Sequence, residues 1–262
     1  NLKLPLMSQI NKSRMQTAFT VSIEARSGIS TGISAFDRAK TIRVAINPSS
    51  RKKDIVSPGH VFPLVARNGG VLERAGHTEA SIDISRMSKL NPSSVICEVM
   101  NEDGRMARLD DLIKFSKKHK IKIASIEDLI AYRLRNERLI YKISSKQIFI
   151  KSMSNVQMSV YKNKLNNYES YVFSKGKFNN NKSIPVRVLS KRINKISIFD
   201  DKEINKTLKL LSKFKNFVLV IINNKINREK SDINITLRYY GIGAQIIKDF
   251  NVKNMILLSR TK

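Results

Sequence analysis

The sequence predicts an α/β (or α+β) fold in which short strands and helices follow one another closely. Residues 17–24 alternate, with Phe19, Val21 and Ile23 on one face, as in a half-buried strand. Ser34 followed by Asp37 is a capping pair, and it predicts a helix over 35–45. The 262 residues are 41% apolar and 27% charged, an ordinary globular balance that argues against wholesale disorder.

The other predicted elements come from apolar patterns and turn residues. Thr78 is expected to cap the helix that follows it, and Glu98 is the only acid in an apolar strand. In chain order we expect a polar loop over 48–58, a strand over 60–66 ended by Gly69–Gly70, a helix over 79–89, a strand over 94–100, a turn over 101–104, a helix over 110–119, a strand over 121–125, a helix over 127–138 and a strand over 217–222.

Charge divides the chain into two halves. The net charge is +28, with +10 on residues 1–135 and +18 on residues 136–262. Such a charge points to nucleic acid or another polyanion. We interpret the Lys-rich second half as a solvated surface, because grooves for single strands usually interleave aromatic side chains. The aromatic cluster that would serve this purpose fits strand core equally well: Tyr161, Tyr168, Tyr171 and Phe173.

The cysteine content and the hydropathy of the chain indicate its cellular compartment. Cys97 is the only cysteine, so an internal disulfide and a cysteine-based zinc cage are excluded. No apolar run approaches the roughly 20 residues of a membrane span, and no signal peptide is visible in the first ten residues. We therefore expect a reduced cytoplasmic setting and no membrane partner.

The segment from Arg74 to Glu79 is the most informative for function. It joins a glycine-containing turn to a helix start, where free backbone N–H groups favour an anion. Arg74 can add a charge-assisted contact to a phosphate, and Gly76 allows close approach of the backbone. His77 stands at the mouth of this site, where it could bind a metal or move a proton. The alternative is a helix cap with a surface histidine.

Two further residues are candidates for proton transfer. Glu98 lies between Cys97 and Val99, which favours a buried functional acid, although strand alternation could instead point it to solvent. His60 follows a Pro-Gly pair at a strand start, and a lone histidine is more often structural than catalytic. His119 is expected on a solvated surface.

These segments together resemble the 3,4-dihydroxy-2-butanone 4-phosphate synthase family of riboflavin biosynthesis. The resemblance is carried in order by TAFTVSIEARSGISTGISAFDRAKTIR, PGHVFPLVARNGGVLERAGHTEASIDI, VICEVMNEDGRMAR and IEDLIAYRLR. It covers residues 1–135, which we expect to form a mixed-sheet synthase domain with flanking helices. Several long motifs in the right order make the resemblance specific.

The resemblance implies a magnesium-dependent (or manganese-dependent) lyase. This family converts D-ribulose 5-phosphate to 3,4-dihydroxy-2-butanone 4-phosphate and formate. By the same resemblance, His77 matches a metal ligand, and Glu98 and His60 match acid–base positions. Substrate binding falls to Arg74, Gly76, His77, Thr78 and Glu98. The resemblance also implies a homodimer.

The second half resembles GTP cyclohydrolase II, as in bifunctional riboflavin biosynthesis proteins. The trace is LRYYGIGAQIIKDFNVKNMILL over 237–258. That family holds zinc with three cysteines, and residues 136–262 contain none, so we expect a degenerate α/β domain without zinc or cyclohydrolase activity.

One departure concerns the synthase half. The family's acidic loop of the type DDEDRENEGD has no counterpart here, and Asn1 aligns with the middle of the family's domain. We therefore expect an N-terminally incomplete sequence, and synthase activity in the full-length protein only. The alternative function is an inactive relative that acts as a basic nucleic-acid-binding or scaffolding protein. The synthase interpretation expects no specific nucleic-acid binding.

Overall fold

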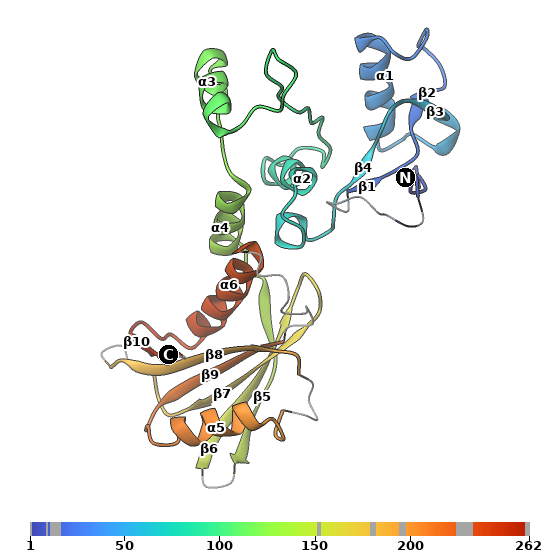
Figure 1. Cartoon of the computed structure of the whole chain (residues 1–262). Helices are drawn as coiled ribbons and strands as arrows, with labels where there is room; N and C mark the ends of the chain where they lie inside the picture. The colour runs from blue at the N-terminus through green and yellow to red at the C-terminus, as the bar shows by residue number, and fades with distance from the viewer. Residues whose placement is uncertain are drawn as a thin grey trace. The chain divides into compact units, whose positions relative to one another are not determined.

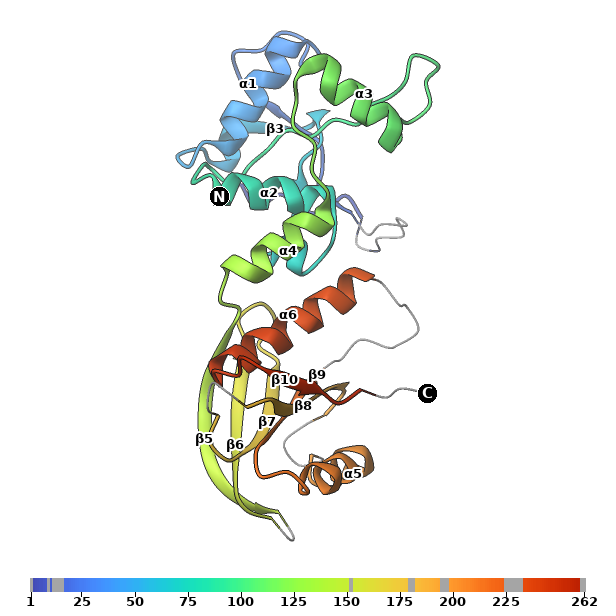
Figure 2. The same ribbon diagram turned by 90° about the vertical axis from the view of Figure 1, so that its left-hand side faces the viewer.

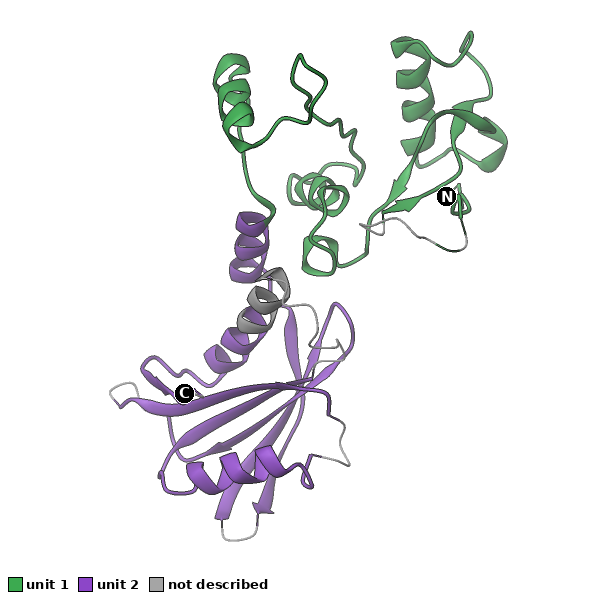
Figure 3. Ribbon diagram, in the orientation of Figure 1, with its two compact units in different colours: residues 1–126 green, residues 127–262 purple. Residues whose placement is uncertain are grey.

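The structure is a computed structural model of the chain. It describes residues 2–8, 10, 17–150, 153–178, 182–193, 198–223 and 233–259, with the side chains of 233–240 excepted. The chain forms two compact units, residues 1–126 and 127–262 (Figure 3). The unit boundary falls nine residues before the cut after Arg135 that charge and composition favour. No helix among the described residues is long and apolar enough to cross a membrane.

In unit 1, helix α1 (Ala35–Ile46) packs on an antiparallel pair of strands, β2 (Ile23–Ala25) and β3 (Ile55–Val61) (Figure 1). The predicted cap is confirmed, because the Ser34 side chain accepts a hydrogen bond from the Asp37 amide. Thr41 of α1 is buried, and its hydroxyl accepts a hydrogen bond of 3.0 Å from the Ala25 amide. This bond fastens the helix to the strand that precedes it.

The strand predicted over 17–24 is two strands. The first, β1 (Ala18–Phe19), pairs with β4 (Leu64–Val65), whereas β2 pairs with β3. Between them the chain changes partners, since the Thr20 amide donates to Pro63 and the Val21 amide to Pro5. The alternation of apolar residues therefore spans two ladders, and Phe19 is exposed while Ile23 is buried.

The loop predicted over 48–58 and the strand over 60–66 also need correction. A short 3-10 helix, η1 (Lys52–Asp54), leads into β3, which already begins at Ile55 because that buried side chain pairs opposite Ala25. The strand predicted over 60–66 is interrupted at Phe62–Pro63, between β3 and β4. Proline has no N–H to give to a ladder.

Helix α2 (His77–Met87) follows the 3-10 turn η2 (Gly70–Leu72). Thr78 does not cap it, contrary to prediction. Gly76 is the N-cap, with extended φ −119° and ψ 154°, and its carbonyl accepts the first intrahelical bond from the Ala80 amide. Thr78 is buried in the first turn because the chain enters the helix two residues earlier than expected.

The strands predicted over 94–100 and 121–125 are absent. Residues 94–99 have no regular structure and are mostly exposed; only a single antiparallel bridge, Met100 to Met106, forms across the turn, and beside it the Ala107 amide donates to the Val99 carbonyl. Among the described residues neither segment has a neighbouring strand to hydrogen-bond with, and a strand needs one. The turn over 101–104 is confirmed by the Gly104 amide, which donates to Asn101. Helix α3 (Leu109–His119) is confirmed as well.

Unit 2 is built on a six-stranded mixed sheet of order β10-β8-β9-β7-β6-β5. Strands β5, β6, β7 and β9 are antiparallel neighbours, whereas β8 runs parallel to both β9 and β10. The strands are β5 (Ile140–Ile150), β6 (Met153–Asn163), β7 (Glu169–Lys175), β8 (Ile184–Lys191), β9 (Phe217–Asn223) and β10 (Met255–Leu257). The strand predicted over 217–222 is confirmed as β9.

Helices cover both faces of this sheet (Figure 2). Helix α5 (Lys202–Leu211) packs on one face and α6 (Ile233–Asp249) on the other, so alternate residues of β9 enter two different cores. Helix α4 (Ile126–Asn136), which matches the helix predicted over 127–138, is held to α6 by the Gln245 amide group, which donates to Leu134 and Glu137. Tyr161, Tyr171 and Phe173 are fully buried strand residues, so they are core and not a stacking platform for bases.

Candidate active site

His60 is paired with a carboxylate that the sequence analysis did not single out. The register of β2 and β3 jumps from Glu24–Val56 to Ile23–Val61, so residues 57–60 bulge out of the ladder. From this bulge the His60 Nδ1 reaches the Glu24 Oε1 in a short hydrogen bond. The Glu24 side chain is 13% exposed and that of His60 43%. The pair therefore joins a sheltered carboxylate to an imidazole that solvent or a substrate can reach.

Two glycines bring these side chains together. A Cβ on Gly59 would overlap the backbone of Ile23 and Glu24, so only glycine allows β3 to lie this close to β2. The Gly59 amide also donates to the Ser22 hydroxyl at 3.1 Å. Gly32 has φ +83°, and a Cβ there would overlap the Glu24 carboxylate.

The loop that carries Gly32 is fixed by Asp37. This buried carboxylate accepts hydrogen bonds from the Ser30 hydroxyl (2.8 Å), the Ser30 amide (3.2 Å) and the Gly32 amide (3.0 Å). These bonds, led by that of the Ser30 hydroxyl, hold the pKa of Asp37 below its ordinary value because they favour the charged form. The loop over 30–32 is thus fixed next to the Glu24 carboxylate.

A second cluster surrounds the start of α2. Arg74 pairs through Nη1 with Glu79 and donates from Nη2 to the Thr17 hydroxyl at 3.0 Å. The same Glu79 carboxylate, 1% exposed, accepts the Arg67 amide at 3.0 Å. Arg74 is therefore fixed in place, with part of its charge balanced by Glu79.

Helix α2 is anchored by a second buried acid one turn further on. Asp83 is 3% exposed and accepts the Val71 amide at 2.8 Å. Gly70, at φ +60°, leaves room for this carboxylate, which a Cβ would overlap. Glu79 and Asp83 lie four residues apart on one helix face, so together they fix the helix start against the loop over 67–73.

The start of α2 keeps the geometry of an anion site. The amides of the first turn have no intrahelical acceptors, and the helix dipole adds positive potential there. Gly76 is packed against the Arg74 guanidinium, where a Cβ would collide. His77 is exposed at the mouth, and Thr78 is buried beside it.

Glu98 does not have the surroundings that its apolar neighbours predicted. It is exposed in the segment over 94–99, and its carboxylate has no hydrogen bond or ion pair with the described residues. The expected burial is wrong for this structure, because no described strand or helix covers the segment. The structure therefore pairs His60 with Glu24 and Arg74 with Glu79, and leaves Glu98 apart from both.

The described residues do not by themselves fit a magnesium ion. Among them, no three His, Cys, Asp or Glu side chains gather where they could hold a metal. Magnesium prefers several oxygen ligands, and the acids nearest in sequence to His77 are already engaged: Glu79 with Arg74, Glu73 with the Gly69 amide and Asp83 with the Val71 amide. His77 is the one candidate ligand that this part of the chain offers.

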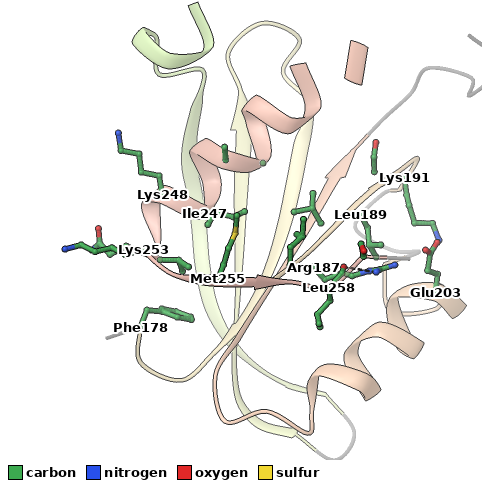
Figure 4. Close-up of a pocket in the computed structure, with 18 residues that line it drawn as sticks. Phe178, Arg187, Leu189, Lys191, Glu203, Ile247, Lys248, Lys253, Met255 and Leu258 are labelled. Carbon is green, nitrogen blue, oxygen red and sulfur yellow. Dashed lines mark hydrogen bonds and ion pairs between the residues drawn. The ribbon is translucent and has the colours of Figure 1, made fainter. Parts of the chain in front are cut away.

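Unit 2 contains a cavity of about 1320 Å³ beside β8 and β10 (Figure 4). Arg187 lines it and donates to the Leu258 carbonyl at 2.8 Å. At one end Lys191 pairs with Asp201 at 2.6 Å and Glu203 at 3.1 Å. Burial works against these charges, yet the mutual hydrogen bonds raise the pKa of Lys191 and lower that of Asp201. No cysteine or histidine lines the cavity, in keeping with a chain that has none after residue 135.

Glu24, Glu79 and Asp83 are the residues that sequence reasoning missed. Glu24 falls on the polar face of the predicted strand, opposite Phe19 and Ile23, which is an inconspicuous place. Glu79 and Asp83 could have been noticed as two acids four residues apart in a predicted helix that follows Gly69–Gly70, but this pattern is only weakly indicative of buried anchoring residues.

Comparisons with known proteins identify the family of the chain. The sequence model of the 3,4-dihydroxy-2-butanone 4-phosphate synthase family matches residues 1–132. The riboflavin biosynthesis protein RibBA of Aquifex aeolicus is 40% identical over 98% of this chain and 71% of its own length. The crystal structure of RibBX, a two-domain synthase from A. baumannii, has a TM-score of 0.81 and 36% identity, covering all of this chain and 75% of the other.

A second solved structure is a 3,4-dihydroxy-2-butanone 4-phosphate synthase in complex with two magnesium ions. It is 35% identical over 52% of this chain and 68% of its own, with a TM-score of 0.47. The family model, RibBA and RibBX together define the chain as a member of a lyase family. The chain belongs to the 3,4-dihydroxy-2-butanone 4-phosphate synthase family of riboflavin biosynthesis.

Proposed function

We propose that this protein converts D-ribulose 5-phosphate to 3,4-dihydroxy-2-butanone 4-phosphate and formate. Family membership supports the proposal, and the observation that carries it is one unit that holds both an anion-binding helix start and an imidazole paired with a carboxylate. The reaction moves protons on a phosphorylated sugar, so it needs both features.

Each proposed site residue has a separate task. Arg74, Gly76 and Thr78 bind the phosphate at the start of α2, where the helix amides and the guanidinium provide donors. His60 takes and returns a proton at Nε2, because its Nδ1 is engaged by Glu24 and its side chain is partly exposed. Glu98 is the proposed second acid–base group, supported by the match of the VICEVMNEDGRMAR motif.

We propose Mg²⁺ or Mn²⁺ as the metal of the full-length protein, with His77 as one ligand; the further oxygen ligands that such an ion needs are not gathered around His77 among the described residues. The resemblance of the RAGHTEA stretch supports the assignment. When bound, a divalent cation polarises the substrate's oxygens and lowers the barrier to proton removal. Calorimetric titration of MgCl₂ or MnCl₂ into the wild type and into His77→Ala tests the assignment. We expect weaker metal binding by His77→Ala, and equal binding by the two proteins would contradict the role of His77.

Residues 1–135 are proposed as the synthase domain and 136–262 as a degenerate GTP cyclohydrolase II-like domain. The absence of cysteine and histidine after residue 135 supports a domain without zinc hydrolysis. We place the protein in the cytoplasm as a homodimer. Exposed apolar side chains of the first unit support a partner copy: Leu90, Val95, Ile96, Met100, Leu109 and Ile123. Sedimentation equilibrium tests the dimer.

The decisive assay is formate release from ribulose 5-phosphate in the presence of MgCl₂. We expect activity in the full-length wild-type protein, and losses of about 100-fold or more when Glu98→Ala or His77→Ala is introduced into it. Lys118→Ala, a change on a solvated face of α3, is the control and should keep its rate. An inactive wild type that binds unrelated RNA with a steep dependence on salt would favour the nucleic-acid alternative instead.

A further inference from the structure

We propose that Glu24 is a positioning residue for His60: its carboxylate fixes the imidazole tautomer and orientation that proton transfer requires. The inference rests on the proposed function, because it assigns His60 its role in that reaction. The contact that carries it is the hydrogen bond between His60 Nδ1 and Glu24 Oε1.

The backbone is shaped for this contact. His60 does not continue the β3 ladder but leaves it in the bulge over 57–60, opposite the step from Ile23 to Glu24. Gly59 permits the close approach that a Cβ would prevent, and its amide is tied to Ser22. Bulges of this kind re-aim a side chain, and here the side chain meets a carboxylate on the neighbouring strand.

The carboxylate is held from the other side as well. Gly32 leaves the space that the Glu24 carboxylate fills, and Asp37 fixes the Gly32 amide at 3.0 Å. Glu24 is therefore confined between His60 and a loop with its own rigid anchor. A surface ion pair formed by chance would not show such confinement on two sides.

The chemistry follows from the two ring nitrogens. A carboxylate accepts only, so His60 must donate from Nδ1–H to Glu24, and its Nε2 is left with a free lone pair. Nε2 can then accept a proton from a substrate carbon or hydroxyl. When it does, the adjacent negative charge stabilises the imidazolium that forms.

The test combines a spectroscopic readout with kinetics. Imidazole ¹⁵N spectra of the full chain, recorded well above neutral pH and assigned with a His60→Gln variant, should show the Nδ1–H tautomer at His60 in the wild type. Glu24→Leu, which has similar volume and no acceptor, should lose this tautomer. Its kcat for formate release should fall about 10–100-fold with little change in KM, and Glu24→Asp should recover part of the loss.

Glu102→Gln removes an exposed turn carboxylate and is the matched control, expected to change neither readout. Circular dichroism establishes that each variant is folded. The proposal is overturned if Glu24→Leu keeps the wild-type His60 spectrum, or if it loses the tautomer but retains full kcat. A wild type that shows the tautomer but releases no formate contradicts the proposed function while leaving the Glu24–His60 pairing in place, so the two failures are distinguishable.

Discussion

Gly70→Ala is expected to loosen the start of α2, the element that presents the proposed phosphate-binding residues. Two contributions make up the expected loss of local stability. Gly70 has φ +60°, and a Cβ in that region costs about 1 kcal/mol. The new methyl group would also overlap the Asp83 carboxylate and displace it from the Val71 amide, to which it is hydrogen-bonded at 2.8 Å in the wild type. Loss of a buried hydrogen bond to a charged group costs about 2 kcal/mol. The opening free energy of the segment over 67–83 should fall by about 3 kcal/mol.

The chain offers a matched control for the first of these terms. Gly104 has φ +81°, and a Cβ there would meet no other atom within 4 Å. Gly104→Ala should therefore cost only the backbone term, about 1 kcal/mol. The difference between the two variants, about 2 kcal/mol, isolates the contact with Asp83.

Amide hydrogen exchange read by mass spectrometry is the appropriate assay. All 7 tyrosines lie in unit 2, so tyrosine fluorescence would not report on α2. Peptides covering 67–83 should exchange about a hundredfold faster in Gly70→Ala, whereas peptides around Gly104 should change only several-fold in Gly104→Ala. Equal, small effects in the two variants would refute the role assigned to Asp83.

Two further predictions concern charge. Lys191→Met removes the ion-pair partner that Asp201 and Glu203 share, and it should lower the free energy of unfolding of unit 2 by about 2 kcal/mol, measured in urea by tyrosine fluorescence. Arg138→Met breaks a more exposed pair of the same unit and should cost about 0.5 kcal/mol, so equal losses would contradict this account. The pKa of Asp37 is lower in the folded chain than in the unfolded one, so its stabilisation is present above its ordinary pKa and is lost as pH falls through the lower, folded value. The protection factors of the loop amides, which correct for intrinsic exchange, should therefore fall in acid more in the wild type than in Asp37→Asn, and parallel curves would argue against the Asp37 bonds.

The elements that were predicted best have a local cause. Ser34 caps α1 by accepting the Asp37 amide, only three residues away. The run over 217–222 is apolar at every position, as expected for a strand that is buried on both faces. The family resemblance likewise came from contiguous motifs. Sequence reasoning was reliable where the deciding contacts lie within a few positions of one another.

The parts that were missed depend on distant partners. The alternation over 17–24 looks continuous, yet Pro5 and Pro63 divide its backbone between two ladders. The apolar run around Glu98 has the composition of a strand, but a strand forms only beside another strand. Glu24 could not be linked to His60 without the bulge and the two glycines that bring the strands together.

The proposed substrate of this member of the synthase family is ribulose 5-phosphate. It is tested most directly by ¹H NMR of the purified full-length protein with ribulose 5-phosphate and MgCl₂, which follows formate and the four-carbon phosphate together. We expect the two products to appear in equal amounts, and His60→Gln to abolish both. Unchanged substrate in the presence of the folded wild-type protein and metal would contradict it.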